Sequence, residues 1–524
     1  MIAKVTTGAV LGIDSFLLSV EVDLSLGIQS FRTVGLPEGA VREAQVRVKS
    51  AIQNSDLPFP VRNITVNLAP AHIRKQGTLY DLPVAVGILA AAEHCASSGP
   101  GWSLEDFLIC GELSLNGDVR PVRGALPLAV AARDAGLTGI ILPHHNAAEA
   151  SVVDGINVLP VHTLLEVIEF FRGERDLAPT TADITDELFH SPDYAFDFAE
   201  VCGQEQAKRA LEVAAAGGHN VLMIGPPGSG KTMLAKRIAT ILPALSFEEA
   251  LETTKIHSVA GCLREGQGIV TQRPFRAPHH TISDVGIVGG GSGVPRPGEV
   301  SLAHNGVLFL DELPEFKKNV LEVMRQPLED QRVTLTRSLM TLSFPASITL
   351  IASMNPCPCG HAGNPKHRCV CSPEQVARYT ARLSGPLLDR IDIHVEVPAV
   401  TYRDLKDARR GEASEVVRAR VQAARDVQLR RFDGTGVHCN AQMRPRELRA
   451  FCTIDDDGHR MLETVIDRLG MSARAYDRIL KVARTIADLE EAGGIAAHHI
   501  AEAVQYRTLD RQQKGGGMGV EAGW

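Results

Sequence analysis

Eight consecutive residues of the chain have the types and spacing of a phosphate-binding loop. Glycines let a backbone come close to a polyphosphate, and the amino end of a following helix adds unpaired N–H groups and a favourable dipole. In this pattern the lysine reaches the terminal phosphates and the last hydroxyl is placed to hold Mg²⁺. The sequence therefore predicts ATP or GTP hydrolysis. The loop consists of Gly225, Pro226, Pro227, Gly228, Ser229, Gly230, Lys231 and Thr232.

Two adjacent carboxylates, Asp311 and Glu312, follow the apolar run 307–310. Asp311 is placed to hold Mg²⁺ through water, and Glu312 is placed to activate the attacking water as a general base. A strand that ends in two acids is common in itself. Its combination with a complete phosphate-binding loop makes the assignment specific.

Apolar runs around these residues indicate the elements that must position them. Residues 221–224 predict a buried strand that ends at the loop, and residues 233–238 predict a helix that begins there. A further strand, residues 348–354, ends at Asn355. The amide of Asn355 is placed to orient a water molecule against the γ-phosphate.

The order of these parts resembles the AAA+ ATPases, and among them the magnesium-chelatase-like branch, over residues 197–510. An arginine finger acts on the nucleotide of a neighbouring subunit, so the resemblance implies a ring, a homo-hexamer. The roles implied by the resemblance are an adenine-pocket segment with Gly203 and Gln204, sensor 1 at Asn355, the arginine finger at Arg390 and the sensor 2 arginine at Arg474.

The segment between Thr232 and Asp311 is longer than a strand–helix–strand return needs. It contains Arg276 and the glycine-rich run 289–293, and it resembles the helix 2 insert of chelatase, helicase and branch-migration motors. Residues 332–344 alternate apolar and polar side chains, which predicts a hairpin with Arg337 near its tip. In the related motors both elements project into a central pore. Arg276 and Arg337 are therefore candidates for contacts to DNA phosphates; a solvated hairpin edge is the alternative.

Four of the ten cysteines lie close together, at Cys357, Cys359, Cys369 and Cys371. Four thiolates with this spacing suit a tetrahedral Zn²⁺ ion, and His361 or His367 could replace one ligand. A closed set of ligands predicts a structural zinc site that braces the nucleotide sensor or a pore-facing loop. Reduced or redox-active thiols are the alternative.

The first 172 residues alternate strand-like runs (16–22, 64–68 and 140–142) with helix-like runs (82–92 and 126–135), which predicts an α/β or α+β domain. Residues 67–85 and 111–124 resemble the proteolytic domain of Lon proteases, which use a Ser–Lys dyad. Asp81 stands at the serine position and Leu126 at the lysine position. A carboxylate and an alkyl chain cannot perform this acyl transfer, so the sequence predicts a Lon-like domain without protease activity.

Composition limits the remaining possibilities. A chain of 524 residues is too long for one core. Its net charge of −8 means that any nucleic-acid contact must come from a local basic surface. We find no run of about 18 apolar residues and no secretory pattern at the amino end, so we expect a cytoplasmic location without membrane association.

The predicted fold class is α/β with several domains. A Lon-protease-like α/β domain covers residues 1–172, and residues 173–196 form a linker. A P-loop α/β AAA+ core with the helix 2 insert, the hairpin and the zinc site covers residues 197–400. An all-helical lid covers residues 401–510, with Ser472 as the N-cap of a helix over 473–491, and residues 511–524 are a disordered tail.

This arrangement resembles the YifB/ComM family over nearly the whole chain. The resemblance implies a hexameric ATP-dependent DNA motor, a helicase or branch-migration enzyme, in recombination, natural transformation or repair. Its expected partners are single-stranded or branched DNA and recombination proteins. Two alternatives stay open: a magnesium-chelatase-type subunit that remodels a partner, and a protein unfoldase.

Overall fold

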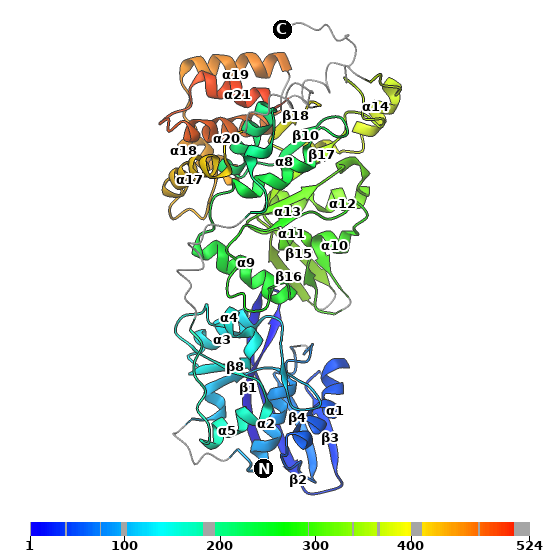
Figure 1. The fold of residues 1–524 in the computed structure, drawn as a ribbon, viewed down its shortest axis with the longest axis vertical. Coiled ribbons are helices and arrows are strands. Elements are labelled where there is room, and N and C mark those ends of the chain that lie inside the picture. Colours follow the sequence, from blue (N-terminus) through cyan, green and yellow to red (C-terminus); the bar gives the residue numbers. More distant parts are fainter. Residues whose placement is uncertain are drawn as a thin grey trace.

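The computed structural model is elongated, with the amino-terminal domain at one end and the P-loop sheet and the helical region together at the other end (Figure 1). It describes residues 2–36, 39–73, 75–95, 102–181, 194–291, 293–337, 340–363, 367–399, 411–469 and 472–507. The predicted disordered tail, residues 511–524, and half of the predicted linker lie outside these residues. Among the helices described, none combines the length and the apolar character needed to cross a bilayer.

The amino-terminal domain is built on a seven-stranded mixed sheet in the order β3-β4-β2-β1-β5-β8-β9. Two long strands, β1 and β2, pair antiparallel from Ile2 with Asp23 to Leu11 with Asp14. The remaining half, from β1 through β5 and β8 to β9, is parallel. The strands are β1 (Ile2–Leu11), β2 (Asp14–Ser25), β3 (Ser30–Val34), β4 (Asn63–Ala69), β5 (Phe107–Ile109), β8 (Gly139–Pro143) and β9 (Asn157–Val161), with a small ribbon of β6 (Glu112–Leu113) and β7 (Val119–Arg120).

Helices cover this sheet, and their apolar side chains form the first of the buried clusters. The strands expected from residues 16–22, 64–68 and 140–142 and the helices expected from residues 82–92 and 126–135 are confirmed to within a few residues at each end. The helices are α1 (Gly39–Asn54), α2 (Asp81–Ala91), α3 (Ala125–Asp134), α4 (Ala147–Ala150) and α5 (Leu164–Arg172).

The central sheet is parallel in every pairing and has the order β11-β14-β17-β10-β18. Its inner strands are short apolar runs that are buried on both faces, as is typical of a parallel sheet between helices. The strands are β10 (Val221–Ile224), β11 (Phe275–Arg276), β14 (Val307–Leu310), β17 (Thr349–Met354) and β18 (Ile393–Glu396), and the three strands predicted around the phosphate loop are among them.

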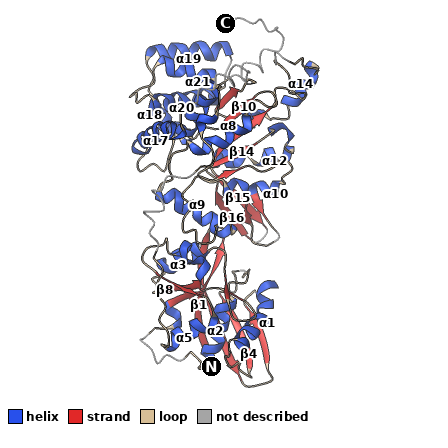
Figure 2. Cartoon of the chain, in the orientation of Figure 1, coloured by secondary structure: helices blue, strands red, loops and turns tan. Residues whose placement is uncertain are grey.

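Short helices surround this sheet, and two small ribbons extend from it, of which the one labelled β15 and β16 projects toward the amino-terminal domain (Figure 2). One ribbon is the predicted hairpin, whose tip at 338–339 lies outside the described residues. The ribbons are β12 (Gly289–Gly290) with β13 (Arg296–Pro297) and β15 (Arg332–Arg337) with β16 (Met340–Pro345). The helices are α7 (Glu205–Gly217), α8 (Lys231–Arg237), α9 (Phe247–Ala260), α10 (Asp284–Val288), α11 (Glu299–Leu302), α12 (Lys318–Val323), α13 (Arg325–Asp330), α14 (Pro373–Thr380) and α15 (Gly385–Leu388).

The carboxyl-terminal region is helical, as predicted. Ser472 is the N-cap of its longest buried helix, and its hydroxyl accepts a hydrogen bond from the backbone N–H of Ala475 at 3.3 Å. That helix ends at Leu489, two residues before the predicted end. The helices are α17 (Ser414–Arg431), α18 (Pro445–Phe451), α19 (Asp456–Leu469), α20 (Ala473–Leu489) and α21 (Ala497–Gln505).

The helix α9 of the P-loop half packs into the core of the amino-terminal domain. Leu245, Ala250 and Ile269 belong to the same buried cluster as the seven-stranded sheet. The backbone N–H of Gly124, at the start of α3, donates to the carbonyl oxygen of Ser258 in α9 at 3.2 Å. The two halves of the chain are therefore joined by shared apolar packing as well as by the covalent linker.

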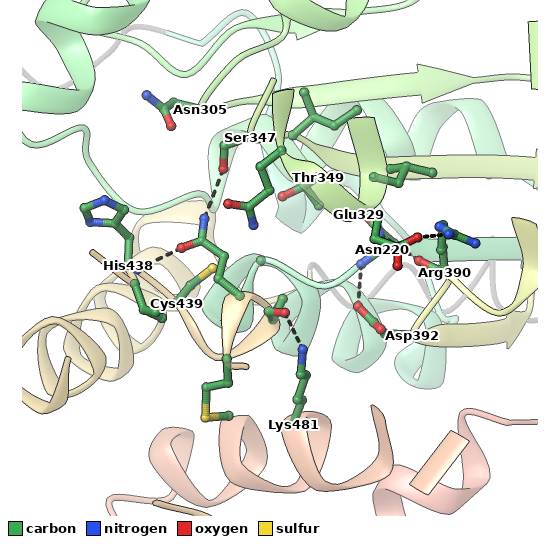
Figure 3. A pocket seen from close by; sticks show the side chains of 18 of the residues that line it. Asn220, Asn305, Glu329, Ser347, Thr349, Arg390, Asp392, His438, Cys439 and Lys481 are labelled. Atoms are coloured by element: carbon green, nitrogen blue, oxygen red, sulfur yellow. Dashed lines mark hydrogen bonds and ion pairs between the residues drawn. The ribbon is translucent and has the colours of Figure 1, made fainter. Parts of the chain in front are cut away.

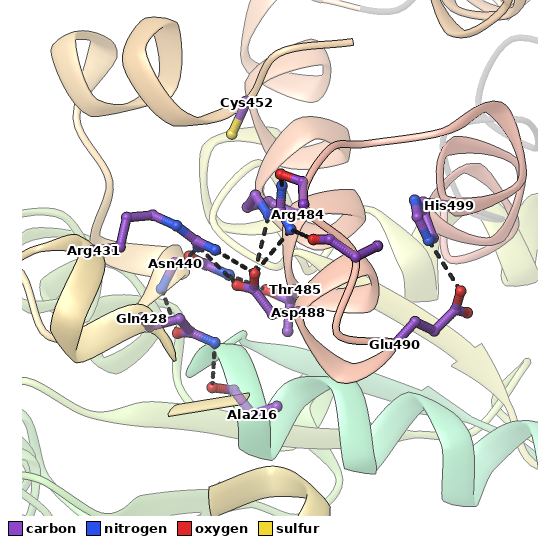
Figure 4. A network of polar contacts seen from close by, with 12 residues as sticks. Ala216, Gln428, Arg431, Asn440, Cys452, Arg484, Thr485, Asp488, Glu490 and His499 are labelled. Atoms are coloured by element: carbon purple, nitrogen blue, oxygen red, sulfur yellow. Dashed lines mark hydrogen bonds and ion pairs between the residues drawn. The ribbon is translucent and has the colours of Figure 1, made fainter. Parts of the chain in front are cut away.

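A buried polar network holds the helical region together (Figure 4). Asp488 in α20 is its centre: its carboxylate accepts hydrogen bonds from Arg431 in α17, from Arg484 in α20 and from the amide of Asn440. Arg484 and Asp488 are both at most 2% exposed. Buried charges of this kind are stable only when each has its partner.

We expect Asp488→Ala to destabilise the helical region by about 3–5 kcal/mol, because it leaves the buried guanidinium group of Arg484 and the partly buried one of Arg431 without a carboxylate. Thermal unfolding followed by circular dichroism measures this effect. The matched control is Asp457→Ala, which removes an exposed pair with Arg460 on the neighbouring helix α19 and should change little. Equal melting temperatures for the two variants would contradict the expectation.

Candidate nucleotide site

The phosphate loop connects the end of β10 to the start of α8. A side chain at Gly225 would meet the carbonyl oxygen of Val397 at 2.1 Å, so only glycine fits there. Gly228 and Gly230 have φ angles of +74° and +91°, and a β-carbon on Gly228 would meet open space. The buried hydroxyl of Ser229 has no hydrogen-bond partner among the described residues. The loop therefore has room and an unused polar group where an anion would sit.

Lys231 at the start of α8 lies over the loop, and its amino group donates to the carbonyl oxygens of Gly225 and Pro226 at 2.8 and 2.9 Å. It also reaches Oδ1 of Asn355 at 3.3 Å. Burial lowers the pKa of Lys231, and the carboxylates of Asp311 and Glu312 oppose that shift. The phosphate-loop lysine and the predicted sensor residue are thus in contact in the structure.

Thr232 and Asp311 lie side by side, with Oγ1 of Thr232 donating to Oδ2 of Asp311 at 2.8 Å. Both are hard oxygen donors, which is the ligand type that Mg²⁺ prefers. The two residues come from different elements, the start of α8 and the end of β14, and they meet because both strands end at the same edge of the sheet. This pair fits the predicted magnesium site.

Glu312 has a left-handed backbone with φ of +54°, which is uncommon for a residue other than glycine. Its N–H donates to Oδ1 of Asp311 at 3.1 Å and to Oγ of Ser353 at 3.2 Å. These bonds hold the backbone in this conformation and leave the side chain 56% exposed beside the loop, with its Oε2 4.0 Å from Nδ1 of His280.

Sequence reasoning missed the role of Ser353, which also hydrogen-bonds the Asp311 carboxylate. Ser353 is two residues before Asn355, so the two-residue period of a strand places both side chains on the same face of β17. This spacing in the sequence could have indicated the role of Ser353.

The segment predicted to line the adenine pocket lies next to the loop. Gln204 adopts φ of +59° at the N-cap of α7, and Gly203 before it adopts +63°. The amide of Gln204 donates to the carbonyl oxygens of Ser229 at 2.6 Å and Pro398 at 3.3 Å. Residues 203–204 are thus close enough to a nucleotide held by the loop to contact it.

Arg390 lies at the opposite end of the parallel sheet, at the amino ends of the strands. The backbone N–H groups of Asp392 and Ile393 both donate to the carbonyl oxygen of Asn220, the residue before β10, and the amide of Asn220 donates to the carbonyl oxygen of Arg390. The four residues of β10 separate this point from the phosphate loop by about 13 Å. Arg390 therefore does not reach the loop of its own chain.

A cavity of about 650 Å³ opens beside Arg390, and Figure 3 shows the side chains that line it. Arg390 pairs there with Glu329 and donates to the carbonyl oxygen of Pro386. Burial, followed by the charges of Arg474 and Arg478, lowers the pKa of Arg390. Arg390, Arg474 and Arg478 all lie on this cavity, each beside a carboxylate partner: Glu329, Asp389 and Asp392 respectively.

Arg474 lies on the same cavity and not at the phosphate loop. Its guanidinium group is 64% exposed and lies 3.6 Å from the Asp389 carboxylate. The expectation that Arg474 couples the lid to the nucleotide therefore does not fit a contact within one chain. The reason is that α20 packs against the amino-end side of the sheet, where sequence order alone does not place it.

A short polar path connects this cavity to the network around Asp488. His219 contacts Oγ1 of Thr485 at 2.7 Å on one side and Oδ2 of Asp392 at 3.4 Å on the other. Although burial opposes it, Arg478 holds the pKa of Asp392 well below its usual range. The helical region and the base of β18 are thus fixed to one another beside Arg390.

The two arginines predicted to contact DNA have different surroundings. Arg276 forms two hydrogen bonds to the Glu299 carboxylate, at 2.6 and 2.7 Å, and is half-buried. Arg337 is exposed, and its guanidinium lies against Gly290 of the glycine-rich ribbon. Arg296, which the sequence did not single out, pairs with Gly290 across that ribbon and is exposed. Within the described part of the chain, neither Arg296 nor Arg337 forms an ion pair.

The four predicted zinc ligands are close together. Their sulfur atoms all lie within 4.8 Å of one another, and three of the separations are 3.3, 3.6 and 3.7 Å. Tetrahedral thiolates around zinc are about 3.8 Å apart. Backbone N–H groups of Val370 and His361 lower the pKa of Cys359 to about 6, whereas the pKa values of Cys369 and Cys371 are raised, in part by the neighbouring cysteines. The chemistry and spacing of the donors fit zinc.

The positions of the Lon dyad hold an ion pair and an apolar side chain. Asp81 is buried at the start of α2 and pairs with Arg47 at 2.7 Å. Burial raises the pKa of Asp81 to about 6, although Arg47 opposes the shift. Leu126 is fully buried in α3. These positions therefore contain neither the serine hydroxyl nor the lysine amine of the Lon dyad.

Comparison with known proteins agrees with this geometry. Residues 197–405 match the family described as magnesium chelatase, subunit ChlI, and residues 20–146 and 411–507 match two further ChlI families, the latter its C-terminal part. The protein YifB of Salmonella typhimurium is 46% identical over 97% of this chain and 98% of its own length. The competence protein ComM of Haemophilus influenzae is 43% identical over the same shares. The chain belongs to the YifB/ComM family.

Membership of the YifB/ComM family makes the chain an AAA+ ATPase of the magnesium-chelatase-like type and implies ATP and Mg²⁺ as its ligands. The amino-terminal region is also similar to Lon protease 2 of Bacillus subtilis, at 32% identity over 26% of each chain. The predicted α/β fold class, with a Lon-like domain, a P-loop core and a helical region, is confirmed.

Proposed function

We propose that this chain is the subunit of a hexameric, ATP-driven DNA motor, a helicase or branch-migration enzyme. Its setting is recombination, natural transformation or repair in the cytoplasm. The observation that carries the proposal is the pair of exposed arginines, Arg296 and Arg337, on two ribbons that meet at Gly290 and project from the P-loop sheet. The relative ComM, which is similar over nearly the whole chain, is named a competence protein. That name supports a role in natural transformation.

The residues around the loop have separate roles in ATP hydrolysis. Lys231 and the backbone N–H groups of the loop bind the phosphates. Thr232 and Asp311 hold Mg²⁺, which neutralises phosphate charge when bound. Glu312 takes the proton of the attacking water, and Asn355, which already contacts Lys231, orients that water.

The second half of the site comes from a neighbouring subunit. Arg390 and Arg474 lie on the cavity at the far end of the sheet, so both would meet the nucleotide of the next chain in the ring. A head-to-tail contact that repeats and closes produces such a ring. Arg390 would stabilise charge on the γ-phosphate, and Arg474 would sense the same nucleotide in trans.

We infer two further properties. The four cysteines hold a structural Zn²⁺ ion, since their donor type and spacing fit it. The Lon-like domain is not a protease, because Asp81 and Leu126 occupy the dyad positions. This domain serves to assemble the ring or to contact DNA.

The DNA proposal predicts that Arg337→Ala weakens binding of a forked DNA at least tenfold, because each of several subunits loses a phosphate contact. Binding is measured by fluorescence anisotropy over a series of salt concentrations. The slope of log affinity against log salt should also become shallower. The matched control is Arg332→Ala, an exposed arginine at the base of the same strand.

ATPase rates with single-stranded, duplex and forked DNA distinguish the proposal from its main alternative. A DNA motor is stimulated by at least one of these, and Arg337→Ala removes the stimulation while the basal rate stays. A chelatase-type subunit that remodels a partner protein, which the matched family descriptions favour, shows no stimulation. Absence of both stimulation and binding would shift the function to partner remodelling.

A further inference from the structure

The cysteine cluster is built into the wall of the nucleotide site. Cys357 follows Asn355 by two residues, is fully buried and accepts a hydrogen bond from the backbone N–H of Ala362 at its sulfur. The N–H of Gly360 donates to the carbonyl oxygen of Cys357 at 3.0 Å, which closes a tight turn after Cys359. The four sulfur atoms therefore determine where this turn lies.

The turn at Gly360 touches the phosphate loop. A β-carbon on Gly360 would lie 2.5 and 2.7 Å from Cδ and Cγ of Pro227, far inside normal contact distance. Gly360 also has φ of +81°, a conformation that favours glycine. The glycine thus permits a close approach between the cysteine turn and the second proline of the loop that binds phosphate.

The other end of the cysteine segment is tied to the sensor. Cys371 is followed directly by Ser372, the N-cap of α14, and this helix carries Tyr379. The phenolic oxygen of Tyr379 faces the backbone N–H of Asn355: burial raises the pKa of Tyr379, this N–H lowers it, and Tyr379 is 7% exposed. The segment therefore leaves the sensor residue at 355, contacts the phosphate loop and returns to the sensor backbone through α14.

We propose that metal bound by the four cysteines clamps the phosphate loop through Gly360 and Pro227, so that zinc occupancy sets the affinity for ATP. This goes beyond a structural zinc knuckle and rests on the zinc binding proposed above. Without the metal, the turn loses its fixed position, and Pro227 and Asn355 lose a common support. The zinc site affects nucleotide binding by positioning the phosphate loop, and it takes no part in hydrolysis.

The experiment uses the full-length protein and two glycine variants. Gly360→Ala introduces the methyl group that collides with Pro227. Gly363→Ala is the matched control, because Gly363 lies in the same loop with φ of +74° and a β-carbon there meets nothing within 4 Å. Zinc per chain is measured by elemental analysis, and the Kd of a fluorescent ATP analogue with Mg²⁺ is measured without DNA.

We expect about one zinc ion per chain in all three proteins and an increase in Kd of at least tenfold for Gly360→Ala alone. Removing zinc from the unmodified protein with a thiol reagent and chelator should raise Kd by a similar factor, and should have a much smaller effect on Gly360→Ala. That lack of additivity is the mark of a shared contact.

Three results would overturn the proposal: purified protein without zinc, an equal Kd for the two glycine variants, or full additivity of zinc removal with Gly360→Ala. None of these measurements involves DNA. Failure of the clamp is therefore distinct from failure of the DNA-motor proposal.

Discussion

Glu312→Gln is expected to bind ATP with nearly unchanged affinity and to hydrolyse it about 10²–10⁴ times more slowly. Glutamine has the same shape but cannot accept the proton of the attacking water. The backbone of Glu312 is held by Asp311 and Ser353 through its N–H, and the amide variant keeps those bonds. The substitution therefore removes the general base and keeps the backbone conformation of residue 312.

Steady-state phosphate release and equilibrium binding of the fluorescent ATP analogue measure the two effects separately. The matched control is Glu315→Gln, three residues further on, whose side chain pairs with Arg382 on the surface. Loss of an exposed pair has little effect. If Glu312→Gln kept more than a tenth of the normal turnover, another residue would have to be the base.

Arg390→Ala is expected to lower ATP turnover by 10³-fold or more while ATP binding stays intact. The guanidinium group lies at the amino ends of the strands, with the length of β10 between it and the loop of its own chain. Its contribution therefore depends on a neighbour. The same reasoning predicts that Lys231→Ala and Arg390→Ala are each inactive as pure proteins.

Mixing the two inactive variants tests the shared site directly. An interface is complete when an Arg390→Ala subunit supplies Lys231 and a Lys231→Ala subunit supplies Arg390. In a random ring about a quarter of the interfaces meet this condition, so activity should reappear on mixing. Arg382→Ala is the control and should be active alone. A mixture as inactive as its components would contradict action in trans.

Local patterns predicted the parts of this site that lie close in sequence to a recognisable element. The phosphate loop, the pair Asp311 and Glu312, and Asn355 each follow an apolar strand, and in the structure Lys231 contacts Asn355 and Thr232 contacts Asp311. The Ser472 N-cap was equally local. In each case the types of a few neighbouring side chains and their spacing were enough to make the prediction.

Features that depend on how distant elements pack could not be predicted in this way. The resemblance implied a sensor 2 role for Arg474 without saying where it lies, and the packing of α20 brings Arg474 to the cavity with Arg390. Arg276 was expected to be available for DNA, but folding places it against Glu299. The contact between Gly360 and Pro227 joins residues more than a hundred positions apart, and no local pattern contains it.

The packing of α9 into the amino-terminal core has a mechanical consequence. The chain runs from the phosphate loop through α8 to α9, and Leu245, Ala250 and Ile269 are buried with the seven-stranded sheet. A rotation of this segment that follows nucleotide hydrolysis would therefore move the whole amino-terminal domain with it. If the ATPase module were separated from the amino-terminal domain at residue 196, those apolar side chains would be exposed to water. We therefore expect the two parts to move as one rigid unit.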